Sequence, residues 1–363
     1  MNRHVPQTWA STRLLSFFCK ASSVFVLIGL LFAPFPANGQ TATSATWYVT
    51  IVLPPKIVAG RPATLAVFGA DGRLAPNVTV VIGEGQSLKT DATGRAFFTA
   101  PAKSGVLFAE ASGASAVALI DESPPSGTQT ATGEITVAPV ISLKDRFTIC
   151  GGGFRGDADA NQVTMNGDRA LVVASSPECV VALPSPRATP GPAKLKVSSS
   201  GAQRNATTTL VSLQFEAPLP APIPGQRSEL TVHVEGSDAP LDVTIQNETP
   251  GVLEFMKGDT QEVRTSGGSR NIAQVQISAV HSGDYSFNAR LIPSPDIPAA
   301  KRYLRAAVPL GPQALQHRVN EAASRLETHP KDREKVRQDL EKMISTTIAG
   351  RFRTLLEAAR AAI

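Results

Sequence analysis

Four oxygen-bearing side chains stand close together near the middle of the chain, at a spacing that could hold a metal ion. Asp157, Asp159 and Asn161 occupy alternate positions, and Asp168 falls at the twelfth position counted from Asp157. Such a spacing matches the ligand positions of a twelve-residue calcium loop. The sixth position is Gln162 rather than glycine, however, and the segment leads into an apolar run. We therefore expect a solvated acidic turn and no cofactor, and calcium binding at these four residues is the alternative.

Cysteine is the second residue type with chemistry to offer. Cys19 lies near the N-terminus, whereas Cys150 and Cys179 lie in the body of the chain. In an oxidising compartment a surviving pair of this kind favours a disulfide. A disulfide that closes a loop of about 30 residues would stabilise the fold by about 3–4 kcal/mol on the chain-entropy model. Two unpaired thiols, or half of a zinc site, are the alternatives.

Catalytic motifs are not found in the sequence. The histidines His233, His281, His317 and His329 have no metal-binding spacing, and there is no Gly-x-Ser-x-Gly elbow. Carboxylates are scattered, so a glycosidase pair has no support beyond composition. We therefore expect a protein that is not an enzyme.

The N-terminus predicts export. Arg3, Arg13 and Lys20 precede an apolar run at residues 21–33, and small residues at 37–39 supply a cleavage site. These features predict a signal peptide over residues 1–39 and a secreted, periplasmic or cell-surface protein; an uncleaved anchor is the alternative. No second apolar run of spanning length follows, so we expect no stable membrane span after processing.

Charge argues against nucleic-acid binding. Of the 35 Lys and Arg residues, three lie in the predicted signal peptide, which leaves 32 against 30 Asp and Glu. A nearly neutral chain lacks the clustered positive charge that phosphate binding requires. Gly, Pro, Val and Thr are abundant, which is typical of short strands joined by tight turns.

Alternating apolar residues predict a first β-sandwich over residues 40–121, beginning with Trp47, Val49, Ile51 and Leu53. The run from Thr90 to Phe97 is similar to a hairpin of bacterial immunoglobulin-like and transthyretin-like domains. Asp91 and Gly94 would supply the turn, and Phe97 is expected to re-enter the core. A proline-rich linker is predicted over residues 122–133.

A second unit is predicted over residues 134–213. It holds a glycine cluster at 151–153, an Asn-Gly turn at 166–167 and a Pro-Gly-Pro corner at 190–192. This order resembles the IPT/TIG family of immunoglobulin-like sandwiches. The resemblance implies a β-sandwich that binds a partner or acts as a spacer, rather than one that catalyses.

A third unit, over residues 214–309, shows the clearest alternation, with Leu230, Val232 and Val234 facing one way. The run from Ser282 to Phe287 resembles the immunoglobulin strand that carries the tyrosine corner. The resemblance implies a structural Tyr285 whose hydroxyl bonds to the backbone. Phe287 stands where that strand carries its core cysteine.

The pattern changes to helical spacing over residues 310–363, which predicts two amphipathic helices joined at 328–330. Their apolar stripe could pack on the third sandwich, self-associate with a second copy, or dock elsewhere. The expected fold is mainly β, with tandem immunoglobulin-like sandwiches followed by a C-terminal α-helical segment.

These features predict an exported, non-enzymatic binding, adhesion or spacer module of the bacterial cell envelope. Its partner would be a protein or an envelope polysaccharide. The alternative is a carbohydrate-binding accessory protein, which would need exposed aromatic side chains on a sheet face. Most phenylalanines stand at positions expected to face the core.

Overall fold

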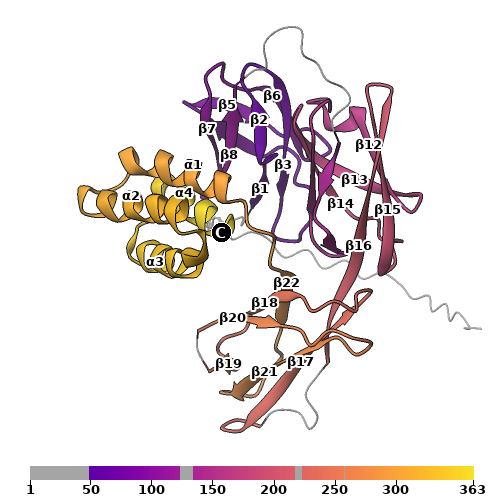
Figure 1. Ribbon diagram of the computed structural model, residues 1–363, viewed down its shortest axis with the longest axis vertical. Helices are drawn as coiled ribbons and strands as arrows, with labels where there is room; N and C mark the ends of the chain where they lie inside the picture. The colour runs from indigo at the N-terminus through magenta and orange to yellow at the C-terminus, as the bar shows by residue number, and fades with distance from the viewer. Residues whose placement is uncertain (1–48, 123–133, 217–222, 257) are drawn as a thin grey trace, which may run out of the picture. The chain divides into compact units, whose positions relative to one another are not determined.

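The computed structural model describes residues 49–122, 134–216, 223–256 and 258–363, which belong to one compact unit (Figure 1). The predicted signal peptide, Trp47 and nearly all of the predicted linker lie outside the described residues. Three separate hydrophobic cores lie within β-sandwiches, and a fourth belongs to the helices.

The first sandwich is built from two sheets that enclose Leu65, Val80 and Leu107. One sheet contains β1 (Thr50–Val52), β3 (Pro62–Phe68) and β6 (Arg95–Thr99). The other has the order β2 (Lys56–Val58), β8 (Ala114–Asp121), β7 (Gly105–Ala111), β4 (Thr79–Ile82) and β5 (Gln86–Lys89). The first strand is thus split between the sheets, and β2 runs parallel to the last strand, β8.

The second sandwich repeats this arrangement. Its strands are β9 (Thr136–Val137), β10 (Val140–Ser142), β11 (Phe147–Cys150), β12 (Asn161–Met165), β13 (Asp168–Ser175), β14 (Cys179–Leu183), β15 (Gly191–Ser199) and β16 (Ala202–Glu216). β9 pairs with β11 in one sheet, whereas β10 joins the other sheet parallel to the last strand, β16. A split first strand of this kind makes both units immunoglobulin-like sandwiches.

The third sandwich shares a strand with the second. The first part of β16 pairs with β15, and its last residues, Ser212 to Glu216, pair with β17 (Arg227–Glu235). The remaining strands are β18 (Asp242–Asn247), β19 (Leu253–Phe255), β20 (Thr260–Arg264), β21 (Ile272–Ala279) and β22 (Phe287–Leu291). No linker separates the two units, because one continuous strand belongs to both.

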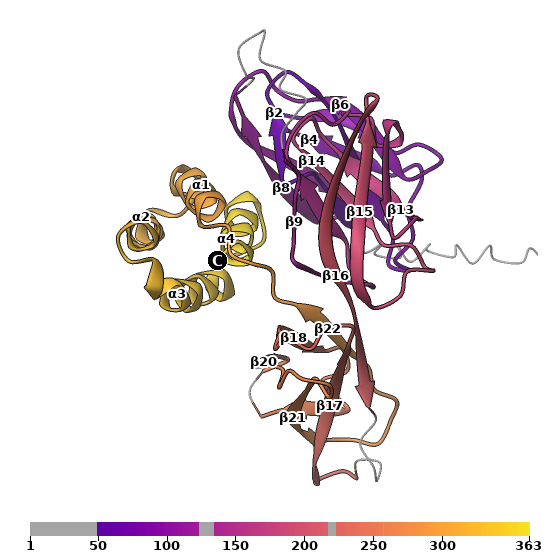
Figure 2. The same cartoon turned by 45° about the vertical axis from the view of Figure 1, so that its right-hand side comes forward.

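The C-terminal segment forms four helices rather than the two expected. They are α1 (Ile297–Ala307), α2 (Gln313–Thr328), α3 (Arg333–Thr346) and α4 (Arg351–Ala361), and Figure 2 shows them nearly end-on. The first begins earlier than expected because the Asp296 side chain accepts a hydrogen bond from Ala299 N and caps it. The expected second helix is interrupted at Thr347, where α3 ends. The backbone of Thr347 is extended, and its hydroxyl donates a hydrogen bond to the Met343 carbonyl. None of the described helices is both long and apolar enough to cross a membrane.

The apolar faces of these helices pack on one another and on the first sandwich. Phe108 and Leu119, from β7 and β8, lie in the same core cluster as the buried residues of the four helices. Arg302 forms an ion pair with Asp121, and the Ser115 and Thr354 hydroxyls are 2.6 Å apart. The apolar stripe therefore docks on the first sandwich and not on the third, which is the alternative of docking elsewhere.

Candidate binding site at the junction of the first two sandwiches

The loop between β11 and β12 crosses to the first sandwich and fastens there. The Thr64 hydroxyl on β3 donates to the Gly156 carbonyl at 2.6 Å and accepts from Ala158 N at 3.3 Å. A Cβ atom on Gly156 would lie 2.1 Å from the Pro62 carbonyl oxygen, so only glycine fits. Ser175 of β13 also pairs with Thr64. The two sandwiches are therefore joined by backbone contact as well as by side chains.

Three of the four candidate calcium ligands, Asp157, Asp159 and Asn161, lie within this junction, with most of their side-chain polar atoms in use. Asp157 accepts a hydrogen bond from Asp159 N at 3.0 Å and caps the short 3-10 helix η1 (Ala158–Ala160). Asn161 is buried, and its amide donates to the Arg155 and Asp157 carbonyls and to the Ser175 hydroxyl. Its carbonyl oxygen accepts from Arg155 N and the Ser199 hydroxyl.

The fourth candidate ligand, Asp168, does not join the other three. It opens β13 opposite Met165, at the far end of the hairpin from Asn161. Among the described residues, no group of three or more His, Cys, Asp or Glu side chains could hold a metal ion. Calcium binding at this loop stays the alternative to a solvated acidic turn.

Asp159 instead meets a guanidinium. Its Oδ1 lies 2.5 Å from Nη1 of Arg95, which comes from β6 of the first sandwich. Both residues line a pocket of about 180 Å³, to which β13 contributes Arg169 and Leu171. We call this the junction pocket and define it by Arg95, Asp159, Asn161, Arg169 and Leu171.

Arg95 is incompletely paired for a buried charge. Over the described parts of the chain it is the one charged residue that is fully buried, with 7% of its surface exposed. The side chain of its partner Asp159 is 75% exposed, and Nε of Arg95 has no hydrogen-bond partner. Burying a charge is costly unless it is well paired. The junction pocket thus holds positive charge that the described residues balance only in part.

Phe97 lies on the same sheet face as Arg95, two residues further along β6, and was expected in the core. Its exposed fraction is instead 57%, and Phe98 is the buried residue. Because side chains alternate along a strand, Ala96 and Phe98 fill the core side and turn Phe97 outward. The consecutive phenylalanines were the signal in the sequence that one of them had to face away from the core.

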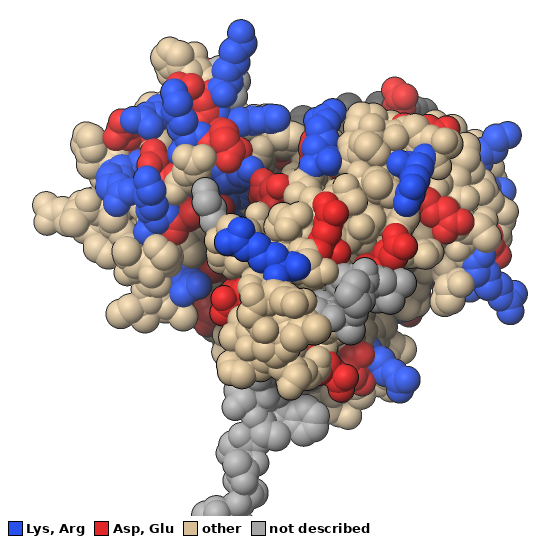
Figure 3. Space-filling view, turned by 90° about the horizontal axis from the view of Figure 1, so that it is seen from below, with Lys and Arg blue, Asp and Glu red and all other residues tan. Residues whose placement is uncertain are grey.

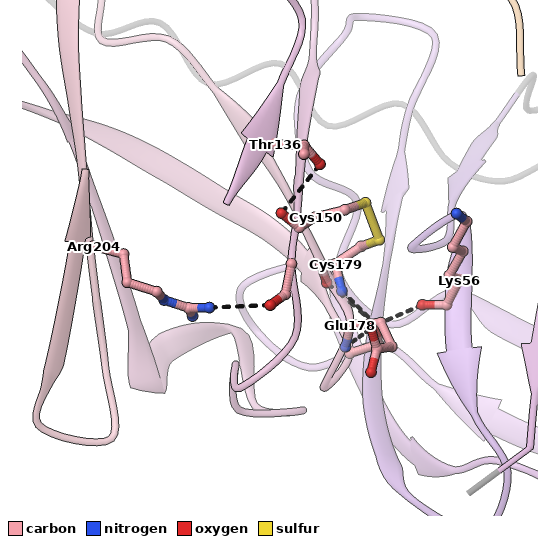
Figure 4. The surroundings of a disulfide bond; sticks show 8 residues. Lys56, Thr136, Cys150, Glu178, Cys179 and Arg204 are labelled. Carbon is pink, nitrogen blue, oxygen red and sulfur yellow. Dashed lines mark hydrogen bonds between the residues drawn. A yellow bond between two sulfur atoms is a disulfide. The ribbon is translucent and has the colours of Figure 1, made fainter. Parts of the chain in front are cut away.

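The predicted disulfide is confirmed. Cys150 and Cys179 are directly opposite each other on β11 and β14, and their sulfur atoms are bonded (Figure 4). The glycine cluster that follows turns the chain at positive φ, and Arg204 donates a hydrogen bond to the Gly152 carbonyl. The Ser176 hydroxyl donates to the Lys56 carbonyl at 2.6 Å, which ties this region to the first sandwich as well. These residues hold the junction in place and do not line the pocket.

Tyr285 lies just before β22, and its ring meets that of Phe287 edge-on, with the centroids 5.8 Å apart. Both rings pack against the third core. Within the described residues the structure records this ring contact for Tyr285, and the hydrogen bond of a tyrosine corner stays a prediction.

Charges are mixed on the surface. Lys and Arg alternate with Asp and Glu on the face shown in Figure 3. Many charged side chains of the described residues are paired, as in the contacts of Arg337 with Glu262 and of Arg351 with Glu110. Exposed pairs of this kind contribute little stability.

Comparison with known proteins identifies no family for this chain. No family model matches, and no curated protein matches. Among solved structures, the I9–I11 tandem of titin is 12% identical over 67% of this chain and 95% of that chain, with a TM-score of 0.21. Invasin, a bacterial integrin-binding protein, is 16% identical over 68% and 57%, with a TM-score of 0.19.

A third structure is that of SGBP-B from Bacteroides ovatus in complex with a mixed-linkage heptasaccharide. It is 10% identical over 72% of this chain and 75% of that chain, with a TM-score of 0.22. Likeness this low carries no argument about this chain, and its fold is read from its own strands. The split first strands and two-sheet cores define the chain as tandem immunoglobulin-like sandwiches with a C-terminal helical segment.

Proposed function

We propose that this protein is an exported, non-enzymatic binding module of the bacterial cell envelope, and that it contacts its partner at the junction pocket. The observation that carries the proposal is the exposed ring of Phe97, on the same sheet face as the buried guanidinium of Arg95. Aromatic residues, phenylalanine included, and arginine are enriched at protein interfaces relative to the rest of the surface.

The interlocked sandwiches support this role. The junction pocket is built from residues of two sandwiches, which are fixed to each other through Thr64, Gly156 and a shared apolar cluster containing Phe68 and Val173. A site held on rigid elements loses little conformational entropy on binding. Export is supported by the disulfide and by the predicted signal peptide. We assign the second sandwich to the IPT/TIG type from its glycine cluster and Asn-Gly turn.

A carbohydrate-binding accessory role is the second candidate. It required an exposed aromatic side chain on a sheet face, and Phe97 meets that requirement. An aromatic ring offers a broad apolar surface against which a flat ligand can pack.

The proposal is tested with envelope extracts of the producing cell, separated into protein and polysaccharide fractions. Binding of the mature protein to immobilised fractions is compared between wild type, Phe97→Ala and Val81→Ala, where Val81 is an exposed apolar residue of β4 in the same sandwich. We expect Phe97→Ala to weaken binding about tenfold, equal to about 1.4 kcal/mol, and Val81→Ala to leave it unchanged. Equal binding by the two variants would refute a role for the junction.

A further inference from the structure

We propose that the junction pocket binds a carboxylate carried by an acidic sugar unit of a polysaccharide. This inference rests on the binding role proposed above and names the chemistry of the ligand. It follows from the charge of the pocket, from the apolar surface in it and beside it, from its size, and from the pairing of the strands that line it.

The charge of the pocket favours an anion. Arg95 and Arg169 both line it, and Asp159 is the one acidic side chain among its described lining residues. Arg169 is exposed on β13 and forms no ion pair within the described part of the chain. A guanidinium presents paired N–H donors that match a carboxylate in a planar, two-point arrangement. One more carboxylate would balance the two cations.

Arg95 supplies the second observation. A buried arginine normally has its donors satisfied, yet Nε is unpaired and the acidic partner lies mostly in water. The desolvation of Arg95 is therefore only partly offset in the free protein. A ligand carboxylate in the pocket would give the Arg95 guanidinium a second anionic partner beside the exposed Asp159.

Apolar surface lies in the pocket and beside it. Leu171 is 45% exposed where it lines the pocket. Phe97 does not line the pocket, but it is exposed two residues from Arg95 on the same sheet face. A sugar ring that carries a carboxylate has a polar group at one end and an apolar C–H face, so it can contact a guanidinium and an apolar side chain together. A bare inorganic anion would leave this apolar surface uncovered.

Size and strand pairing favour a sugar over a peptide. At about 180 Å³ the pocket is smaller than the ~300–1,000 Å³ of sites for whole drug-sized molecules, so it accepts one unit of a larger ligand. Along β13, Arg169 and Ala170 pair with β12, whereas Leu171 and Val172 pair with β14. Each of these residues is paired on one side only, and the free side changes at Leu171, so an extended peptide finds no continuous strand edge along β13 to which it could add.

The test measures binding of the mature protein to a short oligogalacturonide by calorimetry, with a neutral oligosaccharide of equal length as comparison. We expect binding of the acidic ligand, weakened by added salt because the contact is ionic. Arg169→Ala should weaken it about tenfold, and Phe97→Ala should weaken it as well. Lys89→Ala, which removes an exposed cation of β5 in the first sandwich, is the matched control and should bind as wild type.

Equal affinity for the neutral oligosaccharide, or no effect of Arg169→Ala, would overturn the inference. Binding of polyglutamate with the same dependence on Arg169 would overturn it too, in favour of an acidic peptide. Failure of the two proposals is distinguishable. If binding to envelope fractions depends on Phe97 but oligogalacturonide does not bind, only the acidic-sugar inference fails. If no binding depends on Phe97, both proposals fail.

Discussion

Gly156 and Pro62 lie in contact across the junction of two sandwiches, and a Cβ atom on Gly156 would lie 2.1 Å from the Pro62 carbonyl oxygen. The contact sets how closely the loop before β12 can approach β3. The hydrogen bonds of Thr64 with Gly156 and Ala158, and the pairing of Arg95 with Asp159, depend on that approach. One glycine thus controls the geometry of the candidate site.

We therefore expect Gly156→Ala to destabilise the protein by roughly 3 kcal/mol, because the clash is with backbone and cannot be relieved by a side-chain rotation. Chemical denaturation measures the change in free energy of unfolding. Gly251→Ala is the control, since a Cβ there meets nothing within 4 Å. If both variants unfold like wild type, the close approach of the two sandwiches is refuted.

Strand periodicity was enough to predict the sandwiches but not their connection. Leu230, Val232, Val243 and Ile245 alternate with exposed or half-buried residues and are buried, as expected. In β16, however, consecutive residues Leu210 and Val211 are both buried, in the second and third cores respectively. This break in alternation is the only local sign that one strand passes from one sandwich to the next.

The contacts that form the site are distant in sequence, so no local pattern predicts them. Arg95 and Asp159 are 64 residues apart, and Arg302 of α1 meets Asp121 across 181 residues. The helical period was visible, whereas its partner surface at Phe108 and Leu119 was not, because that surface belongs to strands that also fill a sandwich core. Asp157 and Asp159 were identified from their spacing, but Asp159 pairs with Arg95, a cation of the protein itself, and Asp157 caps η1.

The disulfide offers a second prediction. Replacing Cys150 and Cys179 by alanine should lower the free energy of unfolding by about 3–4 kcal/mol, because the unfolded chain regains the freedom that the crosslink removes. Denaturation with and without a reducing agent measures it. The reducing agent should lower the stability of the wild type and leave the double variant unchanged. A mass that does not rise by two protons on reduction of the purified mature protein would contradict the pairing.

Calcium should have no effect on stability. Asp159 is paired with Arg95, Asn161 has its amide and carbonyl groups occupied, and Asp168 lies at the other end of a hairpin. Thermal unfolding is compared in excess calcium and in chelator. A calcium site whose dissociation constant is one hundredth of the calcium concentration would raise the free energy of unfolding by about 2.7 kcal/mol. A rise in melting temperature that Asp157→Asn abolishes would establish a calcium loop instead.

Tyr303 of α1 should make the protein less stable at high pH. Burial in the helical core, with a smaller effect of nearby Asp296, raises the pKa of Tyr303 from 10.0 to about 12. The folded state then favours the neutral phenol. Its stabilising contribution is complete below pH 10, is lost between about pH 10 and pH 12, and amounts to roughly 2–3 kcal/mol in all.

Denaturation at pH 9 and pH 11 should therefore show a loss of about 1.4 kcal/mol in the free energy of unfolding that Tyr303→Phe does not show. Lysines titrate in both proteins, so the difference between the two profiles isolates the phenol. If the profiles coincide, Tyr303 is not held in the apolar core of the bundle.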